Sequence, residues 1–180
     1  MAVYNDVEGW QNHQFWGSGE FALPFGNYEV NITVPADHVL DATGVLQNRK
    51  EVFSKEMMRR YEQAKKSYDQ PVMIVTQEEV EAAEKGFSDK TKTWKFKADM
   101  VRDFGFATSR KFIWDMMAVK IGGKDVMAVS LYPKEGNPLW ERYSTKVVAH
   151  TIKTYSKFTV DYPYPVAISV HTDRIGMEYP

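Results

Sequence analysis

The sequence predicts a protein of the α+β class that is mainly β. Segments in which apolar and polar residues alternate occur before and after a helical stretch, and one long amphipathic helix follows them near the C-terminal end. The clearest strand is 28–34 (YEVNITV), in which every second residue is apolar, as in a half-buried antiparallel strand. We therefore expect an antiparallel β domain, saddle-like or sandwich-like, with a helical insertion, followed by a helix and a strand that open a second domain.

The β region is expected to begin with strands at 20–23 and 28–34. Pro35 ends the second strand, because proline cannot donate a hydrogen bond to a neighbouring strand. Short apolar segments at 38–40 and 45–46 should continue the sheet. The apolar side of the second strand, which should be buried, consists of Tyr28, Val30, Ile32 and Val34.

A helical insertion is expected at about 49–86. Its first apolar residues follow helical spacing, which predicts an amphipathic surface helix as far as Tyr68. Thr76 and Glu79 have capping-box spacing, so a second helix should cover 77–85. The basic residues of the first helix alternate with acids and are interpreted as a solvated face; they are Arg59, Arg60, Lys65 and Lys66.

Strands return after the insertion. Alternation at 93–98 and apolar runs at 104–107 and 112–121 predict three of them, and the two glycines at 122–123 predict a hairpin turn into a Val-rich strand at 125–132.

One long helix and a last strand follow. Asn137 can cap the helix, with Pro138 at its first position, and 166–170 has the pattern of a buried strand. The buried stripe of the helix is expected to consist of Trp140, Tyr143, Val147, Val148, Ile152 and Tyr155.

Length and composition suit one domain, or one domain and part of a second. The chain has 180 residues, of which 43% are hydrophobic, so it can bury a core. The composition changes near Lys134, where we expect a domain boundary between 1–133 and 134–180. The net charge is -1 with acids and bases interspersed, so nucleic acid is not an expected partner.

The composition excludes sites that depend on cysteine and also bears on the location of the protein. The sequence has no cysteine, which excludes disulfides, thiolate metal sites and cysteine nucleophiles. No apolar run approaches the roughly 20 residues that cross a bilayer, so we expect no membrane span. The N-terminus lacks a basic stretch followed by a hydrophobic one. The protein is therefore expected to be cytoplasmic, or extracytoplasmic with its signal removed.

No pattern in the sequence predicts catalysis by this chain alone. A catalytic zinc needs three protein ligands, and helix-borne protease sites supply two histidines four residues apart, but HExxH does not occur. The serines lack a nucleophile-elbow sequence; they include Ser109, Ser130, Ser144 and Ser169. The histidines are too scattered for a ligand pair; they are His13, His38, His150 and His171. We interpret His150 as a packing residue, whereas His171 could face a cleft.

The run RIGMEY near the C-terminal end is similar to the GxMEN exopeptidase motif of the aminopeptidase N family, which consists of gluzincin metallopeptidases that hold zinc. Met177 and Glu178 stand at the Met and Glu of the motif, and Gly176 stands at its variable position. Two positions depart from it, because Ile175 replaces the first glycine and Tyr179 replaces the asparagine.

Three further segments resemble the family in the same order along the chain. Residues 19–44, which include YEVNITVPADHVLDATG, resemble a strand and a Pro-containing loop of the family's N-terminal β domain. Residues 93–109 (TWKFKADMVRDFGFATS) resemble the segment that closes that domain. Residues 154–165 (TYSKFTVDYPYP) resemble the helix end and Tyr-Pro corner just before the motif. The closest likeness is to a bacterial branch of M-E-Y-P type.

The resemblance implies that the chain is a fragment of a zinc aminopeptidase, which removes N-terminal residues from peptides. Residues 1–133 would be the C-terminal part of the N-terminal β domain, and 134–180 the truncated start of the catalytic domain. The HExxH helix and its distant Glu ligand would lie beyond Pro180. The implied cofactor is zinc in the parent protein and none in this chain, and the implied partners are a peptide substrate and the remainder of the catalytic domain.

The resemblance also implies a substrate-binding role for Gly176, Met177 and Glu178. A carboxylate on an edge strand can pair with the free ammonium of a peptide, while the backbone of the strand aligns the peptide. Glu178 is the expected amine anchor, and no catalytic residue is expected in this chain.

A self-contained, nonenzymatic β module is the alternative interpretation. Such a module would bind glycan or protein through exposed tryptophans, since aromatic faces stack on sugars and fill interfaces. The candidates are Trp10, Trp16, Trp94 and Trp140.

Overall fold

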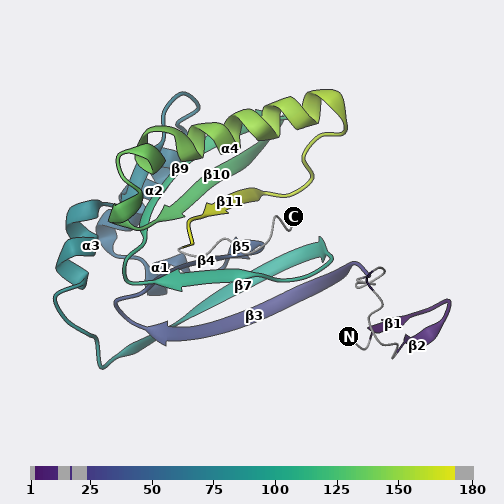
Figure 1. Cartoon of the computed structure of the whole chain (residues 1–180), viewed down its shortest axis with the longest axis horizontal. Coiled ribbons are helices and arrows are strands. Elements are labelled where there is room, and N and C mark those ends of the chain that lie inside the picture. The colour runs from purple at the N-terminus through teal and green to yellow at the C-terminus, as the bar shows by residue number, and fades with distance from the viewer. Residues whose placement is uncertain (1–2, 12–16, 18–23, 173–180) are drawn as a thin grey trace.

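The computed structural model describes residues 3–11, 17 and 24–172. The fold is α+β and mainly β, with antiparallel sheets and a few helices, as predicted. Figure 1 shows three layers: the long helix α4 (Leu139–Phe158), a four-stranded sheet below it, and a second layer of strands at the bottom. A separate hairpin near the N-terminus consists of β1 (Val3–Asn5) and β2 (Gly9–Gln11).

The upper sheet has the strand order β11-β10-β9-β6. β9 and β10 form an antiparallel hairpin, and both glycines of its turn have positive φ, 52° at Gly122 and 79° at Gly123. β10 and β11 are parallel, and α4 connects them, so the three make a β-α-β unit. The strands are β6 (Val72–Val75), β9 (Ile113–Ile121), β10 (Lys124–Tyr132) and β11 (Val166–Val170).

The lower layer contains an antiparallel sheet of order β3-β7-β5 and the separate antiparallel pair β4-β8. Gly44 lies between β4 and β5 with φ of 91°, and a Cβ there would stand 2.2 Å from the carbonyl oxygen of Lys97 on β7. The strands are β3 (Gly26–Pro35), β4 (Val39–Ala42), β5 (Val45–Leu46), β7 (Thr91–Val101) and β8 (Phe106–Ser109).

Two cores lie on opposite faces of β9. Trp114 and Met116 point into the larger core, between the upper sheet and the lower layer. Met117 and Val119 belong to a smaller core against α4, with Ile152 of that helix. Because both faces are covered, nearly every residue of β9 is buried, which explains why its sequence is an apolar run without alternation.

The predicted buried side of β3 alternates as expected, although most of it is half-buried. Tyr28, Val30 and Ile32 are intermediate in exposure, and Val34 alone among the four is buried. β3 is the last strand of its sheet, so one of its flanks has no neighbouring strand to cover it.

The expected insertion contains more than two helices. The first predicted helix is divided into α1 (Arg49–Val52) and α2 (Lys55–Ala64), because Ser54 caps a new helix by accepting the Met57 N–H at 3.1 Å. The strand β6, which the sequence analysis did not predict, follows and pairs with β9. The predicted capping box is present at the start of α3 (Gln77–Ala83).

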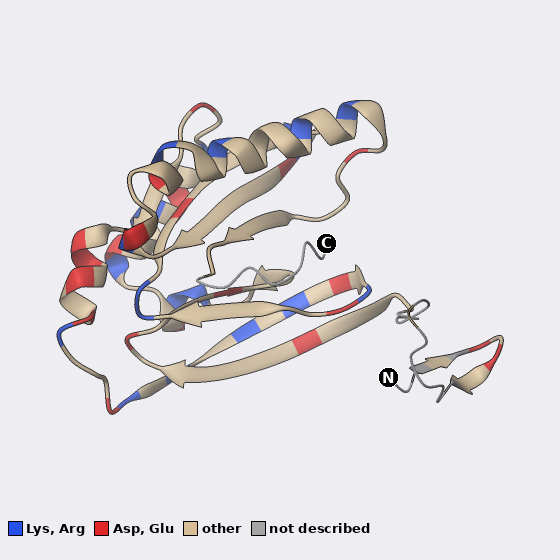
Figure 2. Cartoon of the chain, in the orientation of Figure 1, with Lys and Arg blue, Asp and Glu red and all other residues tan. Residues whose placement is uncertain are grey.

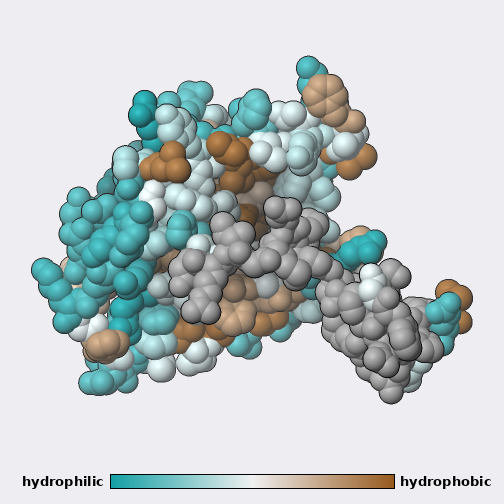
Figure 3. All heavy atoms as spheres, in the orientation of Figure 1, coloured by the Kyte–Doolittle hydropathy of each residue, from teal (hydrophilic) through white to brown (hydrophobic). Residues whose placement is uncertain are grey.

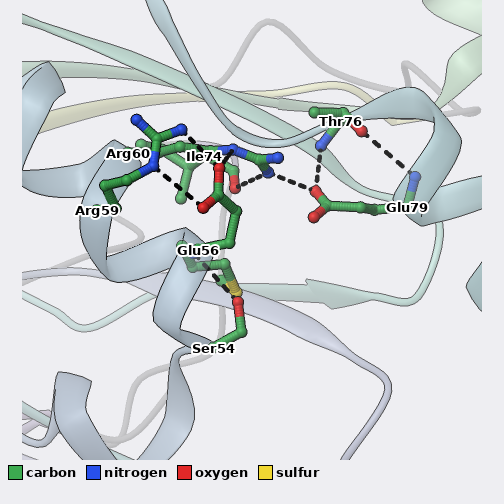
Figure 4. A network of polar contacts seen from close by, with 8 residues as sticks. Ser54, Glu56, Arg59, Arg60, Ile74, Thr76 and Glu79 are labelled. Carbon is green, nitrogen blue, oxygen red and sulfur yellow. Dashed lines mark hydrogen bonds and ion pairs between the residues drawn. The ribbon is translucent and has the colours of Figure 1, made fainter.

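Arg60 joins these elements (Figure 4). Its guanidinium donates to Glu56 of α2 at 3.1 Å, to the Ile74 carbonyl of β6 at 3.2 Å and to Glu79 of α3 at 2.7 Å. Arg59 pairs with Glu56 and Lys65 with Glu62. Figure 2 shows basic and acidic residues interspersed over this region, which agrees with a solvated face.

The predicted buried stripe of α4 is partly wrong. Thr145, Ala149 and Ile152 are the buried residues of the helix, whereas Tyr143 and Val147 are exposed, as is Tyr155. The side that faces the sheet carries the small residues Thr145 and Ala149 beside Ile152, where α4 packs closely on β9 and β10. Three of the larger apolar residues that we assigned to this side point outward.

The expected boundary near Lys134 lies inside the β-α-β unit. β10 ends at Tyr132, immediately before this boundary. β11, which follows α4 in the sequence, pairs with β10, so strands from both sides of the boundary are neighbours in one sheet. In the part of the chain that the structure describes, no helix is long and apolar enough to span a membrane.

Candidate functional site

The predicted motif residues Gly176, Met177 and Glu178 lie outside the described residues, as do His13 and Trp16. The structure describes the strand that leads toward the motif. That strand, β11, is the terminal strand of the upper sheet, and the backbone continues its pairing as far as His171, whose N–H donates to Leu131 O at 2.9 Å.

A large cleft lies beside β11, between the upper sheet and the lower layer. Its volume is about 940 Å³. β11 and the corner 162–165 form one wall, and β4, β7, β8 and the loop after β7 form the other. Tyr164 crosses between the walls, since its hydroxyl donates to Met100 O at 3.2 Å. We refer to this cavity as the inter-sheet cleft.

A smaller cavity of about 210 Å³ adjoins it, and we refer to it as the Asp41 pocket. The two cavities share Asp41, Val45 and Val166, among others. The Asp41 pocket enters the space between α1, α2 and the lower face of the upper sheet. Its apolar walls include Leu46, Phe53, Trp114, Met116 and Val129.

Asp41 is the acid common to both cavities. Burial raises the pKa of its carboxyl to about 7, although the Ala42 N–H and the positive charge of Arg49 act in the opposite direction. The Ala42 N–H donates to Oδ1 at 2.9 Å. A carboxylate that titrates near neutral pH at the side of a cavity is a candidate for ligand binding or proton transfer.

Arg49 lines the same pocket and lies over the ring of Tyr61, with 4.7 Å from its guanidinium carbon to the ring centroid. Its Nε is buried and has no hydrogen-bond partner among the described residues. Within that part of the chain, Arg49 and Asp41 do not form an ion pair within 4.0 Å.

The described histidines do not gather. His38 lies 3.2 Å from the Thr108 hydroxyl, and burial lowers its pKa. His150 contacts Thr154 on the exposed side of α4 at 3.3 Å, so it is not the packing residue that we expected. His171 stacks edge-on against Trp140. Over 3–11, 17 and 24–172, no three His, Asp or Glu side chains are grouped to hold a metal ion.

Three of the serines do come together, under α4. Ser130 donates to Ser144 at 2.8 Å, and Ser144 lies 3.5 Å from Ser169. Ser130 also contacts Thr145, which donates to the buried Asp115. These hydroxyls form a partly buried chain without a histidine base, so the arrangement binds α4 to the sheet and does not resemble a nucleophilic site.

The tryptophans differ in exposure. Trp94 is 0% exposed and packs against Phe53, so it cannot contribute to a binding surface. Trp140 is half-buried against Tyr132. Trp10 of β2 is 76% exposed and forms an edge-on pair with Tyr4 at 5.4 Å.

The chain matches no known protein family, no curated protein and no solved structure.

Sequence reasoning did not find Asp41 or Arg49. One signal was present, because Asp41 interrupts the apolar run Val39-Leu40-Asp41-Ala42, and a charge within a buried strand needs a partner or a function. Arg49 gave no such signal, since an arginine at the start of an amphipathic helix is ordinary.

Proposed function

We propose that the chain is a section of a zinc-dependent aminopeptidase, to which it contributes a β domain and the strand that binds the substrate amine. In this proposal the zinc site is held by a part of the parent protein that follows Pro180. The observation that supports this proposal most directly is the GxMEN-like run at 174–179. It follows three segments that resemble the aminopeptidase N family in the same order along the chain.

The surroundings of β11 support the proposal. The motif follows β11, the terminal strand of its sheet, by a few residues, and the inter-sheet cleft lies beside that strand. A strand at such an edge can align an extended peptide through its backbone, and a carboxylate on it can pair with the ammonium of the peptide.

The exposed side of α4 gives a second line of support. Leu139, Tyr143 and Val147 are exposed and spaced four residues apart, and Tyr155 and Phe158 are exposed nearer the end of the helix; we call these five residues the outer stripe. Figure 3 shows hydrophobic side chains at the surface in this region. Large apolar side chains exposed along one helix are typical of an interface, and the remainder of a catalytic domain is the partner that the proposal supplies.

The experiment that tests the proposed role is Glu178→Ala in the full-length parent. A charge-assisted contact contributes about 1.5 to 3 kcal/mol, so kcat/KM for a peptide with a free N-terminus should fall by roughly ten- to a hundredfold. The fold should be retained, because the lost contact is made to the substrate.

An N-acetylated peptide is the control substrate. It has no ammonium to pair with Glu178, so its slow cleavage should respond much less to the substitution. Equal losses on free and acetylated substrates would show that Glu178 is not the amine anchor. The reading frame of the parent gives an independent test, since the proposal requires HExxH downstream of Pro180.

The nonenzymatic β module retains one specific observation in its favour, the exposed Tyr4 and Trp10 pair. A reading frame that stops at Pro180 would favour it. Titration of the chain with oligosaccharides, followed by tryptophan fluorescence and compared with Trp10→Ala, would then test glycan binding.

A further inference from the structure

We infer that the Asp41 pocket binds a small zwitterion with an apolar side chain, a free α-amino acid such as leucine. Its ammonium would pair with Asp41, its carboxylate with Arg49, and its side chain would enter the apolar interior. The inference goes beyond the proposed aminopeptidase function, because it needs neither zinc nor any residue outside the described part of the chain.

Asp41 and Arg49 carry opposite charges at the walls of the pocket. Asp41 and Arg49 line one cavity, yet within the described residues they form no ion pair with each other or with another side chain. Asp41 accepts the N–H of its own neighbour, Ala42, and Arg49 leaves a buried Nε without an acceptor. Partly buried charges without partners are costly, and a ligand that supplies both partners would remove that cost.

The other charged residues that line the pocket, Lys65 and Asp125, differ from Asp41 and Arg49 in having charged partners. Lys65 pairs with Glu62 at 3.0 Å, and Asp125 accepts from Lys120 at 2.9 Å. Both side chains therefore already have a partner of opposite charge. Asp41 and Arg49 remain as the groups that a ligand would meet, one for a cation and one for an anion.

The Arg49 side chain is held against an aromatic ring. Its guanidinium lies over the Tyr61 ring, 4.7 Å from the centroid, which restricts the orientation of the side chain. Tyr61 is in turn packed edge-on against Phe53, at 5.7 Å between ring centroids. A guanidinium restricted in this way can bind a carboxylate through two parallel hydrogen bonds at lower entropic cost.

The Asp41 pocket is small and its walls are mostly apolar. The pocket volume of about 210 Å³ is below the range of about 300 to 1,000 Å³ that is typical for drug-sized ligands, so the ligand is smaller. Leu46, Trp114 and Met116 contribute apolar surface to the same pocket. A single apolar amino acid has both charges at one end and hydrocarbon at the other, and this matches the lining.

The test is a titration of the 180-residue chain with L-leucine by isothermal calorimetry, together with two blocked ligands. N-acetyl-leucine lacks the ammonium, and leucine amide lacks the carboxylate. We expect saturable binding of leucine with Kd on the order of 1 mM or tighter. Each blocked ligand should bind at least about tenfold more weakly, because each loses one charge-assisted contact.

Matched variants identify the residues. Asp41→Asn and Arg49→Gln should each weaken leucine binding by about tenfold or more. Asp69→Asn and Arg59→Gln remove the same charges at exposed positions outside the pocket and should bind leucine as the unaltered chain does. Circular dichroism establishes that each variant is folded before its affinity is compared.

Three results would overturn the inference: no saturable binding of leucine by the unaltered chain, blocked ligands that bind as well as leucine, or pocket variants that bind like their controls. If a pocket variant does not fold, the comparison of the three ligands on the unaltered chain decides the matter. None of these results depends on peptidase activity, so failure here and failure of the proposed function are distinguishable.

Discussion

Asp115 is a carboxyl group in the interior of the protein, on the face of β9 that α4 covers. It is 1% exposed and accepts hydrogen bonds from Tyr132 at 2.6 Å and from Thr145. Burial raises the pKa of Asp115 to about 6, although the two hydroxyl donors lower it. The group is thus neutral in mildly acidic solution and charged inside the protein at neutral pH.

This pKa gives the first prediction, on the pH dependence of stability. An unfolded Asp titrates near pH 3.9, so the folded state binds the proton more tightly. The free energy of unfolding should therefore decrease as the pH rises from about 4 to about 6 and then level off, by about 3 kcal/mol for this one group. Urea denaturation at a series of pH values measures it.

Asp115→Asn is the comparison for this measurement. The amide of the substituted residue stays neutral at every pH, so position 115 no longer contributes to the change of the free energy of unfolding with pH. Asp41, whose raised pKa also makes stability fall with pH, is present in both proteins and cancels in the difference. Identical pH profiles for the two proteins would mean that Asp115 is not protonated in the folded state as we describe.

Gly44 gives the second prediction. Gly44→Ala should destabilise the chain by roughly 2 to 4 kcal/mol, because alanine is unfavourable at φ of 91° and its Cβ would collide with the Lys97 carbonyl. Gly86→Ala is the matched control, since a Cβ there meets nothing within 4 Å and φ is not positive. The control should change stability by less than about 0.5 kcal/mol in denaturant titration. Similar losses for both would place Gly44 away from β7.

At the scale of elements, α4 shows what a pattern can and cannot determine. Its existence follows from helical spacing, but the face that it buries depends on the surface beneath it. Thr145 is on the sheet side because its hydroxyl donates to Asp115. Ala149 is on the same side because the helix lies close to the sheet there. Hydrophobicity alone ranks Tyr143 and Val147 above them, which is why we assigned both to the wrong side.

The third prediction compares the two sides of α4. Ile152→Ala should cost about 2 to 4 kcal/mol, because Ile152 fills the smaller core. Val147→Ala, on the outer stripe, should cost less than about 0.5 kcal/mol in this chain. The free energy of unfolding of both variants decides between the two faces, and a larger loss for Val147 would reverse our assignment.

Local patterns predicted the long strands, but they did not predict β1, β2 or β6. Alternation identified β3 and β7, and the glycine pair at 122–123 identified the hairpin, because both signals are local. β6 was missed because its four residues lie between two helical patterns and become a strand by pairing with β9. The Asp41 pocket could not be predicted, since it depends on where distant elements meet.

For the molecule as a whole, the fourth prediction is that the purified chain binds no stoichiometric zinc. The sequence has no cysteine and no paired histidines, and zinc requires three or four close ligands. Elemental analysis after dialysis should give well below one zinc per chain. One tightly held ion would overturn this prediction and place the ligand set within the 180 residues.

The β-α-β unit also has a practical consequence for dividing the protein. A chain cut after Pro133, at the boundary that composition suggests, would keep β10 and lose both α4 and β11. The apolar side chains of β9 and β10 that α4 covers would be left in water, and β10 would become a bare sheet edge. Bare edges with apolar faces recruit other chains, so such a piece would be prone to aggregate, and expression of the β region requires a later end point.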